Sequence, residues 1–193
     1  VLAGPQGTLF GANAQSGAIR IISNKPDKSK FAAGYDLEGN QVSHGDAGYV
    51  VQGFVNFPLM RNRAAIRLVG WDEHDAGYID NIATTHVFKQ AFLGQPDITV
   101  NNAPIVKDNF NVATTKGGRA ALDIDLGENW TATAMVLRQQ LKTTGVWDYN
   151  PALGDLKVAR LLPEKESDDF TQSSLTLTGK LGKTTLTYTG AHL

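Results

Sequence analysis

The densest group of side chains that could do chemistry is the run Asp72-Glu73-His74-Asp75. Carboxylates and an imidazole are the groups that ligate metal ions and exchange protons. The run closes a stretch with strand-like alternation, and consecutive residues of a strand point to opposite faces. The four side chains therefore cannot converge on one ion, and we interpret the run as the solvated end of a strand. The other histidines, at positions 44, 86 and 192, lack the spacing of a ligand motif.

Nucleophilic catalysis also lacks its usual signatures in this sequence. No serine lies in a G-x-S-x-G motif. The chain has no cysteine, which excludes a cysteine nucleophile, a thiolate zinc site and a disulfide. Asp123 and Asp125 share one face of an expected strand, and we interpret them as charges that pair with Arg67, Arg119 or residues of the N-terminal region. The sequence therefore predicts no enzyme, no cofactor and no metal site.

Glycines punctuate the N-terminal stretch Val1–Pro26, which reads VLAGPQGTLFGANAQSGAIRIISNKP. Glycine tolerates positive φ and lets other backbone approach closely, so this spacing indicates tight turns in a packed setting. A P-loop would need G-K-[ST] and a dinucleotide fingerprint would need G-x-G, and neither occurs here. From the residues alone, the stretch is a glycine-rich turn region followed by a strand over Ala18–Ser23, which ends at Lys25-Pro26-Asp27.

Composition narrows the classes of protein further. The chain carries 18 Lys and Arg against 19 Asp and Glu, well mixed, so the charge does not indicate a nucleic-acid partner. No run approaches the roughly 18 apolar residues that a transmembrane helix needs. Strands of a membrane barrel alternate and leave only a weak hydropathy signal, so a membrane setting stays open.

The rest of the chain reads as strands separated by polar breaks, with no convincing helix. The expected strands cover Phe31–Asn40, Tyr49–Phe57, Arg63–Asp72, a segment around Arg119–Leu126, Trp130–Lys142, Asp169–Leu181 and Thr184 onward. The cleanest of them places Ala120, Leu122, Ile124 and Leu126 on one face. Its other face carries Arg119, Asp123 and Asp125. The faces of Trp130–Lys142 remain unassigned.

From the second expected strand onward, the connections run short, long, short, long, short. The long ones are the apparently irregular stretches Asp75–Asn111 and Thr143–Asp168. Outer-membrane barrels show this asymmetry between short periplasmic turns and longer extracellular loops. A β-sandwich more usually keeps turns at a regular spacing. The pattern favours an all-β, antiparallel transmembrane barrel whose lumen-facing charges are Arg67, Arg119, Asp123 and Asp125; a passive porin-like protein and a soluble β-sandwich binding protein are the alternatives.

The glycine-rich stretch resembles the end of the plug domain of TonB-dependent outer-membrane receptors. That family carries a related run, G-P-x-G-x-x-[YF]-G followed by GG-x-I-x-[IV]-x-[TS]-K-x-P, just before its barrel begins. The positions that match are Gly4, Pro5, Gln6, Gly7, Leu9, Phe10, Gly11, Asn13, Gly17, Ile19, Ile21 and Pro26. The sequence departs from the family at Ala3 and Ala12, where arginine is common, at Ser16 in place of glycine, and at Arg20 in place of asparagine.

Three later segments also resemble receptors of this family: Gly77–Asn81, Gly117–Leu122 and the region from Asn150-Pro151 to Gly154–Leu156. The resemblance implies that residues 1–27 end a plug domain and that residues 28–193 form about seven strands of a barrel that closes with 22 in such transporters. The chain is then expected to be an internal fragment of a longer receptor.

The resemblance also implies a function and partners. Such a receptor takes up a scarce solute, such as an iron chelate (siderophore), a cobalamin-like compound or an oligosaccharide, across the bacterial outer membrane. TonB with ExbB and ExbD supplies energy from the proton gradient through a part of the plug that lies outside this sequence. Aromatic side chains on loops held by a rigid scaffold suit ligand capture, although they also pack against each other. The candidate ligand-contacting residues are Tyr78, His86, Phe88, Phe92, Trp147 and Tyr149.

Overall fold

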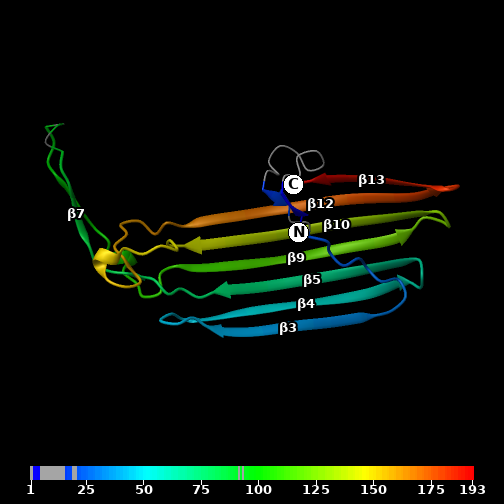
Figure 1. The fold of residues 1–193 in the computed structure, drawn as a ribbon, viewed down its shortest axis with the longest axis horizontal. Helices are drawn as coiled ribbons and strands as arrows, with labels where there is room; N and C mark the ends of the chain where they lie inside the picture. Colours follow the sequence, from blue (N-terminus) through cyan, green and yellow to red (C-terminus); the bar gives the residue numbers. More distant parts are fainter. Residues whose placement is uncertain (1, 5–15, 19–20, 91, 93) are drawn as a thin grey trace.

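The computed structural model describes residues 2–4, 16–18, 21–90, 92 and 94–193. Its main element is one antiparallel sheet of seven long strands (Figure 1). The strands are β3 (Ala32–Gln41), β4 (Ala47–Met60), β5 (Ala64–Asp75), β9 (Val112–Asp125), β10 (Trp130–Thr144), β12 (Glu166–Leu181) and β13 (Thr184–His192). Each long strand lies beside the one before it in the chain, so the sheet is an open meander with β3 and β13 at its edges. The all-β, antiparallel fold expected from the sequence is confirmed.

Several strands run further than the alternation predicts. β9 begins at Val112, well before Arg119, although its first half contains Thr, Lys and two glycines with weak strand propensity. That half is paired on both sides, with β5 and with β10, and this pairing outweighs the local preference. β4 continues through Pro58 to Met60, beyond the end of the expected strand at Phe57, and its register shifts there by one residue in a β-bulge.

The alternation of short and long connections is confirmed. Residues 61–63, 126–129 and 182–183 form short turns at one end of the sheet, which we call the turn end. The long connections 76–111 and 145–165 leave the other end, the loop end (Figure 1).

The sequence suggested that these long connections are irregular, but the structure shows regular elements within them. Among the described residues they contain the short strands β6 (Asp80–Asn81), β7 (Thr85–Phe88), β8 (Ile98–Asn101) and β11 (Lys157–Val158), and the 3₁₀ turns η2 (Ala103–Ile105) and η3 (Pro151–Leu153). β6 pairs in parallel with β11, which joins the two connections, and β7 pairs with β8 as a hairpin that projects away from the sheet (Figure 1). In the described residues no helix is long and apolar enough to cross a membrane.

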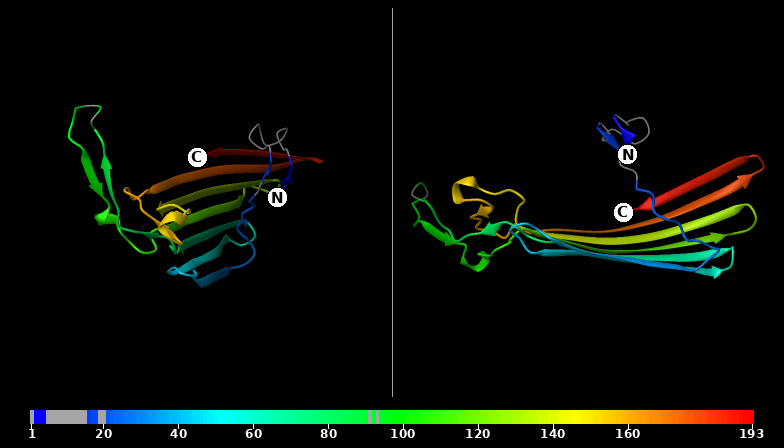
Figure 2. Two further views of the ribbon diagram at one scale, coloured as in Figure 1. Left: turned by 60° about the vertical axis from the view of Figure 1, so that its left-hand side comes forward. Right: turned by 60° about the horizontal axis from the view of Figure 1, so that its bottom comes forward.

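The N-terminal segment lies on the side toward which the sheet curves (Figure 2). There β1 (Leu2–Ala3) pairs with β2 (Gly17–Ala18). Gly17 has a φ of +147°, and a Cβ on it would lie 2.6 Å from the Leu2 carbonyl oxygen, so this pairing requires glycine. The strand expected over Ala18–Ser23 is shorter in the structure: β2 ends at Ala18, and residues 21–23 belong to no strand.

Candidate functional site

One face of the sheet is apolar across neighbouring strands. Its paired rows place Phe57, Ile66, Leu122, Ala134 and Leu175 side by side. We call it the outer face, and we call the opposite face, which residues 24–30 cross, the inner face. These face assignments agree with the alternation predicted for β9, and they assign the faces of β10, which the sequence left open.

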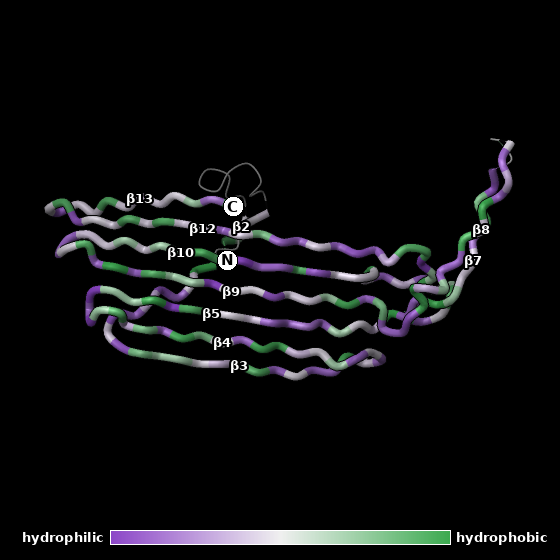
Figure 3. Tube along the Cα trace, turned by 180° about the vertical axis from the view of Figure 1, so that it is seen from behind, coloured by the Kyte–Doolittle hydropathy of each residue, from purple (hydrophilic) through white to green (hydrophobic). Residues whose placement is uncertain are grey.

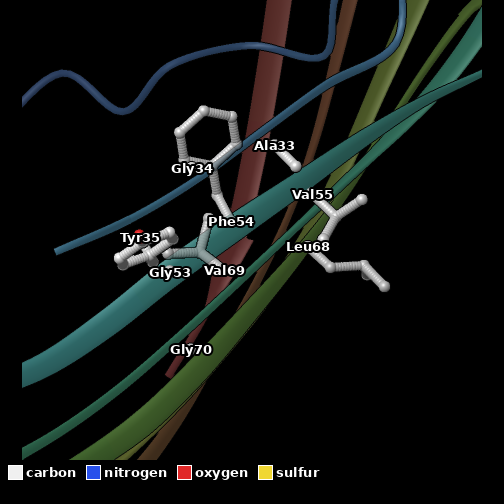
Figure 4. Close-up of a pocket in the computed structure, with 9 residues that line it drawn as sticks. All are labelled: Ala33, Gly34, Tyr35, Gly53, Phe54, Val55, Leu68, Val69 and Gly70. Atoms are coloured by element: carbon white, nitrogen blue, oxygen red, sulfur yellow. The ribbon is translucent and has the colours of Figure 1, made fainter.

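No second layer of the described residues covers the outer face. Val55 and Leu68 project to this side, away from the ring of Phe54 (Figure 4). At its two ends Leu37 on β3 is 64% exposed and Tyr188 on β13 is 63% exposed. A continuous apolar surface of this extent marks contact with lipid or with another protein.

The loop-side limit of the apolar band crosses the strands obliquely. On β3, the outer-face apolar side chain nearest the loops is Leu37. On β13 it is Tyr188. The residues paired in sequence across the sheet, starting from Leu37 on β3, end at Asp169 on β12. Tyr188 on β13, however, pairs with Leu177 of β12. The apolar limit has therefore moved by eight residues along β12, toward the turn end. Eight residues over six strand-to-strand steps, at about 3.3 Å per residue and about 4.8 Å per step, give a slope of about 40°.

Beyond this limit the outer face becomes charged. Lys116 Nζ lies 2.9 Å from a carboxylate oxygen of Asp72, and Arg138 lies 3.0 Å from Asp169. Figure 3 shows the hydrophilic halves of β10 and β12 nearer the loop end. Of the Asp72–Asp75 run, Asp72 and His74 lie on this face, and the His74 ring stacks on that of Tyr49 at 5.6 Å.

The inner face near the turn end carries a three-residue ion cluster. Lys28 Nζ lies 2.7 Å from Asp123 and 2.6 Å from Asp125, and the hydroxyls of Thr133 and Thr131 donate to the same two carboxylates. Partial burial by itself would lower the pKa of Lys28, but its hydrogen bonds to both carboxylates outweigh that effect and raise it. The aspartates therefore pair with Lys28, not with Arg67 or Arg119.

A buried asparagine fixes the same segment to the sheet. Asn56 is fully buried on the inner face of β4. Its Nδ2 donates to the carbonyl oxygens of Asp27 and Lys30, both at 2.9 Å, and its Oδ1 accepts from the Asp27 amide at 2.8 Å. Together Asn56 and Lys28 hold residues 27–30, which we call the linker anchor, against the wall of the sheet.

Two arginines on the inner face have different surroundings. The guanidinium of Arg67 lies over the ring of Phe54, 3.8 Å from its centroid. Arg119 donates to the Asn24 carbonyl oxygen at 3.3 Å. Both line a cavity of about 310 Å³. In the described part of the chain neither forms a salt bridge.

At the loop end, three buried asparagines organise the long connections into what we call the loop cap, residues 76–84, 102–111 and 145–165. Asn81 donates to the Ile105 and Arg160 carbonyl oxygens and accepts from the Arg160 amide. Asn102 makes equivalent bonds, donating to Ile82 and Arg160 and accepting from Thr84. Asn111 accepts from two consecutive amides, those of residues 78 and 79. Side chains thus satisfy backbone groups that a sheet ladder would otherwise pair.

The structure divides the six candidate ligand-contacting residues between two places. Tyr78 and Trp147 lie together in the loop cap, with ring centroids 6.1 Å apart. Tyr149 lines a separate cavity of about 300 Å³ beside Asp148 and Arg160, which form a salt bridge.

The other three lie on the projecting hairpin or its tip. His86 and Phe88 contact each other edge to face at 4.5 Å, and Phe92 is almost fully exposed. The candidates therefore do not form one site in the described chain.

Sequence reasoning missed Lys28, Asn56 and the asparagines of the loop cap. Each of these residues makes its hydrogen bonds or ion pairs with residues distant in the sequence. A single asparagine also adds nothing to the alternation of apolar and polar residues from which strands are predicted. Of the expected plug motif, Gly4, Gly17, Ile21 and Pro26 are described, and both glycines have positive φ. Pro5, Gln6, Gly7, Gly11, Asn13 and Arg20 lie outside the described residues. No family model, no curated protein and no solved structure matches this chain.

Proposed function

We propose that this chain is part of a TonB-dependent receptor of the bacterial outer membrane, in which the seven-stranded sheet is a section of the barrel wall. Its outer face contacts lipid and its inner face lines the lumen. Residues 1–27 are the end of the plug, which the linker anchor joins to the wall.

The oblique apolar band is the observation that carries this proposal. Strands of outer-membrane barrels tilt by about 35–45° to the membrane normal, so a lipid-facing band must cross them at that angle. The slope of about 40° derived from the pairing rows agrees with this requirement. A buried face of a sandwich has no reason to be limited along such a line, because its partner sheet follows the strand direction to within about 30°.

The open edges of the sheet extend the proposal. In lipid, unpaired backbone groups along β3 and β13 would each cost several kcal/mol, so further strands must pair with both edges. Seven strands are then a part of the larger barrel, which in this receptor class closes with about 22 strands.

In this proposal the receptor takes up a scarce solute actively. The solute, such as an iron chelate, a cobalamin-like compound or an oligosaccharide, binds at the loop end, where Trp147 and Tyr149 of the loop cap and the aromatic residues of the hairpin are exposed. TonB with ExbB and ExbD acts on the plug from the opposite side, and the plug moves to open a path along the inner face.

Single-cysteine labelling tests the membrane face, since the chain has no cysteine of its own. In the intact protein in bilayers, a fluorophore on Ile66→Cys or Leu122→Cys should be quenched by brominated lipid. The matched position Thr133→Cys, on the inner face at the same level as Asp123, should not be quenched. Equal quenching at all three positions, or none at Leu122, contradicts the assignment of the outer face to lipid.

Transport is tested in cells that carry the gene. Uptake of one solute from a panel of iron chelates, cobalamins and oligosaccharides should be lost when either the gene or TonB is removed. Flux that persists without TonB would instead favour the passive porin-like alternative.

A further inference from the structure

We infer that Arg67 and Arg119 form a binding site for an oxyanion on the inner face, with a carboxylate-bearing small molecule as its ligand. The inference rests on the proposed function in one respect, because it needs the inner face to be open to water. The site is lined by the strands β3, β4, β5 and β9 and by Asn24 of the segment that crosses them.

Arg67 is held in place without using its hydrogen-bonding capacity. Its guanidinium carbon lies over the Phe54 ring, 3.8 Å from the centroid, and this cation–π contact holds the group but satisfies none of its N–H donors. Its Nε is buried and has no hydrogen-bond partner among the described residues. A buried donor without a partner is costly, and an acceptor in the adjoining cavity would remove that cost.

Arg119 brings a second positive charge to the same cavity. It pairs across the strands with Val69, two residues after Arg67, so the two side chains are diagonal neighbours on one face. Among the described residues it donates one hydrogen bond, to the Asn24 carbonyl oxygen, so its other N–H donors have no partner there and suit a ligand. Two like charges side by side repel each other, and an anion between them converts this repulsion into attraction.

Among the described residues one acidic side chain lines the cavity, and it already accepts a hydrogen bond. This residue is Asp36, which accepts a hydrogen bond of 3.0 Å from Gln52. It forms no salt bridge with either arginine in the described structure. Asp36 therefore limits the affinity of the site for anions without filling it.

The chemistry of the donors selects the ligand class. Guanidinium groups bind carboxylates and phosphates through paired N–H donors, and a carboxylate matches this fork well. A cavity of about 310 Å³ is at the lower end of the range for small-molecule sites. It accommodates a small polycarboxylate or the acidic arm of a larger solute, beside the apolar surface of Phe54.

Citrate is the probe for the experiment, with isothermal titration calorimetry on the intact protein in detergent at low salt. Saturable binding is expected in the wild type. Arg67→Gln and Arg119→Gln should each weaken it at least tenfold, and the double variant should abolish it. Asp36→Asn should strengthen it. Arg61→Gln, which removes the same charge from an exposed turn, is the matched control and should bind citrate as the wild type does.

Phe54→Leu keeps both charges and removes the ring beneath Arg67, so weaker binding in this variant, with an unchanged melting temperature, supports the geometry even if an arginine variant fails to fold. No citrate binding by the wild type, as expected if a carboxylate of the protein itself fills the site, overturns the inference. Binding that survives in the double variant also overturns it. Quenching by brominated lipid at Leu122→Cys is independent of this result, so the anion site can fail while the membrane assignment stands.

Discussion

The seven-stranded sheet and the loop cap are held together in opposite ways. The sheet is a single layer held together mainly by backbone hydrogen bonds between its strands. Its apolar side chains remain exposed on the outer face. The loop cap has little regular structure, yet it contains fully buried groups such as Ile79 and Asn81. There, side-chain amides take the place of a ladder.

The difference shows where each region gets its specificity. Paired strands tolerate many different side chains, because backbone groups make the hydrogen bonds between them. The alternation of side chains sets only which face of the sheet is apolar. A loop that buries its backbone must satisfy each polar group individually, and one asparagine can serve three of them. The stability of the sheet should therefore depend on what contacts its outer face. The stability of the loop cap should depend on single asparagine side chains.

The largest effect is expected from Asn81→Ala. It leaves the Arg160 amide and the Ile105 and Arg160 carbonyl oxygens without their partner, at a cost of about 4 kcal/mol in the stability of the loop cap. Hydrogen exchange should become fast in residues 78–84 and 157–160 while β9 and β10 stay protected. Asn150→Ala, which removes one exposed hydrogen bond to the Ala152 amide, is the control and should change little. Loss of protection throughout the sheet would show that the two regions are not distinct.

A charge on the outer face comes next. Leu122→Arg should cost about 2–4 kcal/mol if the position lies near mid-bilayer, because lipid does not solvate a guanidinium. The measurement is assembly and resistance to heat of the intact protein. Met135→Arg places the same charge on the inner face of the neighbouring strand and should be tolerated better. Unchanged heat resistance of Leu122→Arg would refute the lipid assignment.

The linker anchor, residues 27–30, is held to the sheet by Lys28 and Asn56. Substitutions there should reduce stability by an intermediate amount. Lys28→Met leaves the buried Asp123 without its positive partner, and because Lys28 itself is partly exposed the expected cost is about 1–2 kcal/mol. The pKa of Lys28 is raised in the folded protein, so its contribution is complete below its unfolded pKa of about 10.4 and is lost as the pH rises through the folded value.

Wild-type protein should therefore lose stability above this pH in denaturant titrations. Lys28→Met should lose less over the same interval. Parallel pH profiles for the two proteins would mean that the ion cluster does not stabilise the fold.

The smallest effect is expected from the charged rows beyond the apolar band. Lys116→Gln and Arg138→Gln each remove an exposed salt bridge, and exposed pairs contribute little in water. Neither variant should shift the melting temperature measurably. A clear destabilisation would indicate that this part of the outer face is covered rather than solvated.

Expectations from the sequence succeeded where the signal was local. The alternation of Ala120, Leu122 and Ile124 against Asp123 and Asp125 predicted both faces of β9 correctly. The ends of strands were less accurate: the polar first half of β9 resembles a loop until β5 and β10 pair with it. The stretch Asp75–Asn111 appeared irregular because its order comes from Asn81, Asn102 and Asn111, whose partners are mostly distant in sequence.

By itself, the sequence determined the all-β class, the approximate positions of the seven long strands, the faces of β9 and the alternation of short and long connections, because these depend on the types of residues that lie close together in the chain. Only the tertiary structure decided the strand register, and with it the slope of the apolar band. It also decided that Lys28 rather than an arginine meets Asp123 and Asp125, 97 residues away in the case of Asp125, and that Arg67 and Arg119 share a cavity. Such contacts depend on how distant segments align, and a local pattern of residue types carries no record of that alignment.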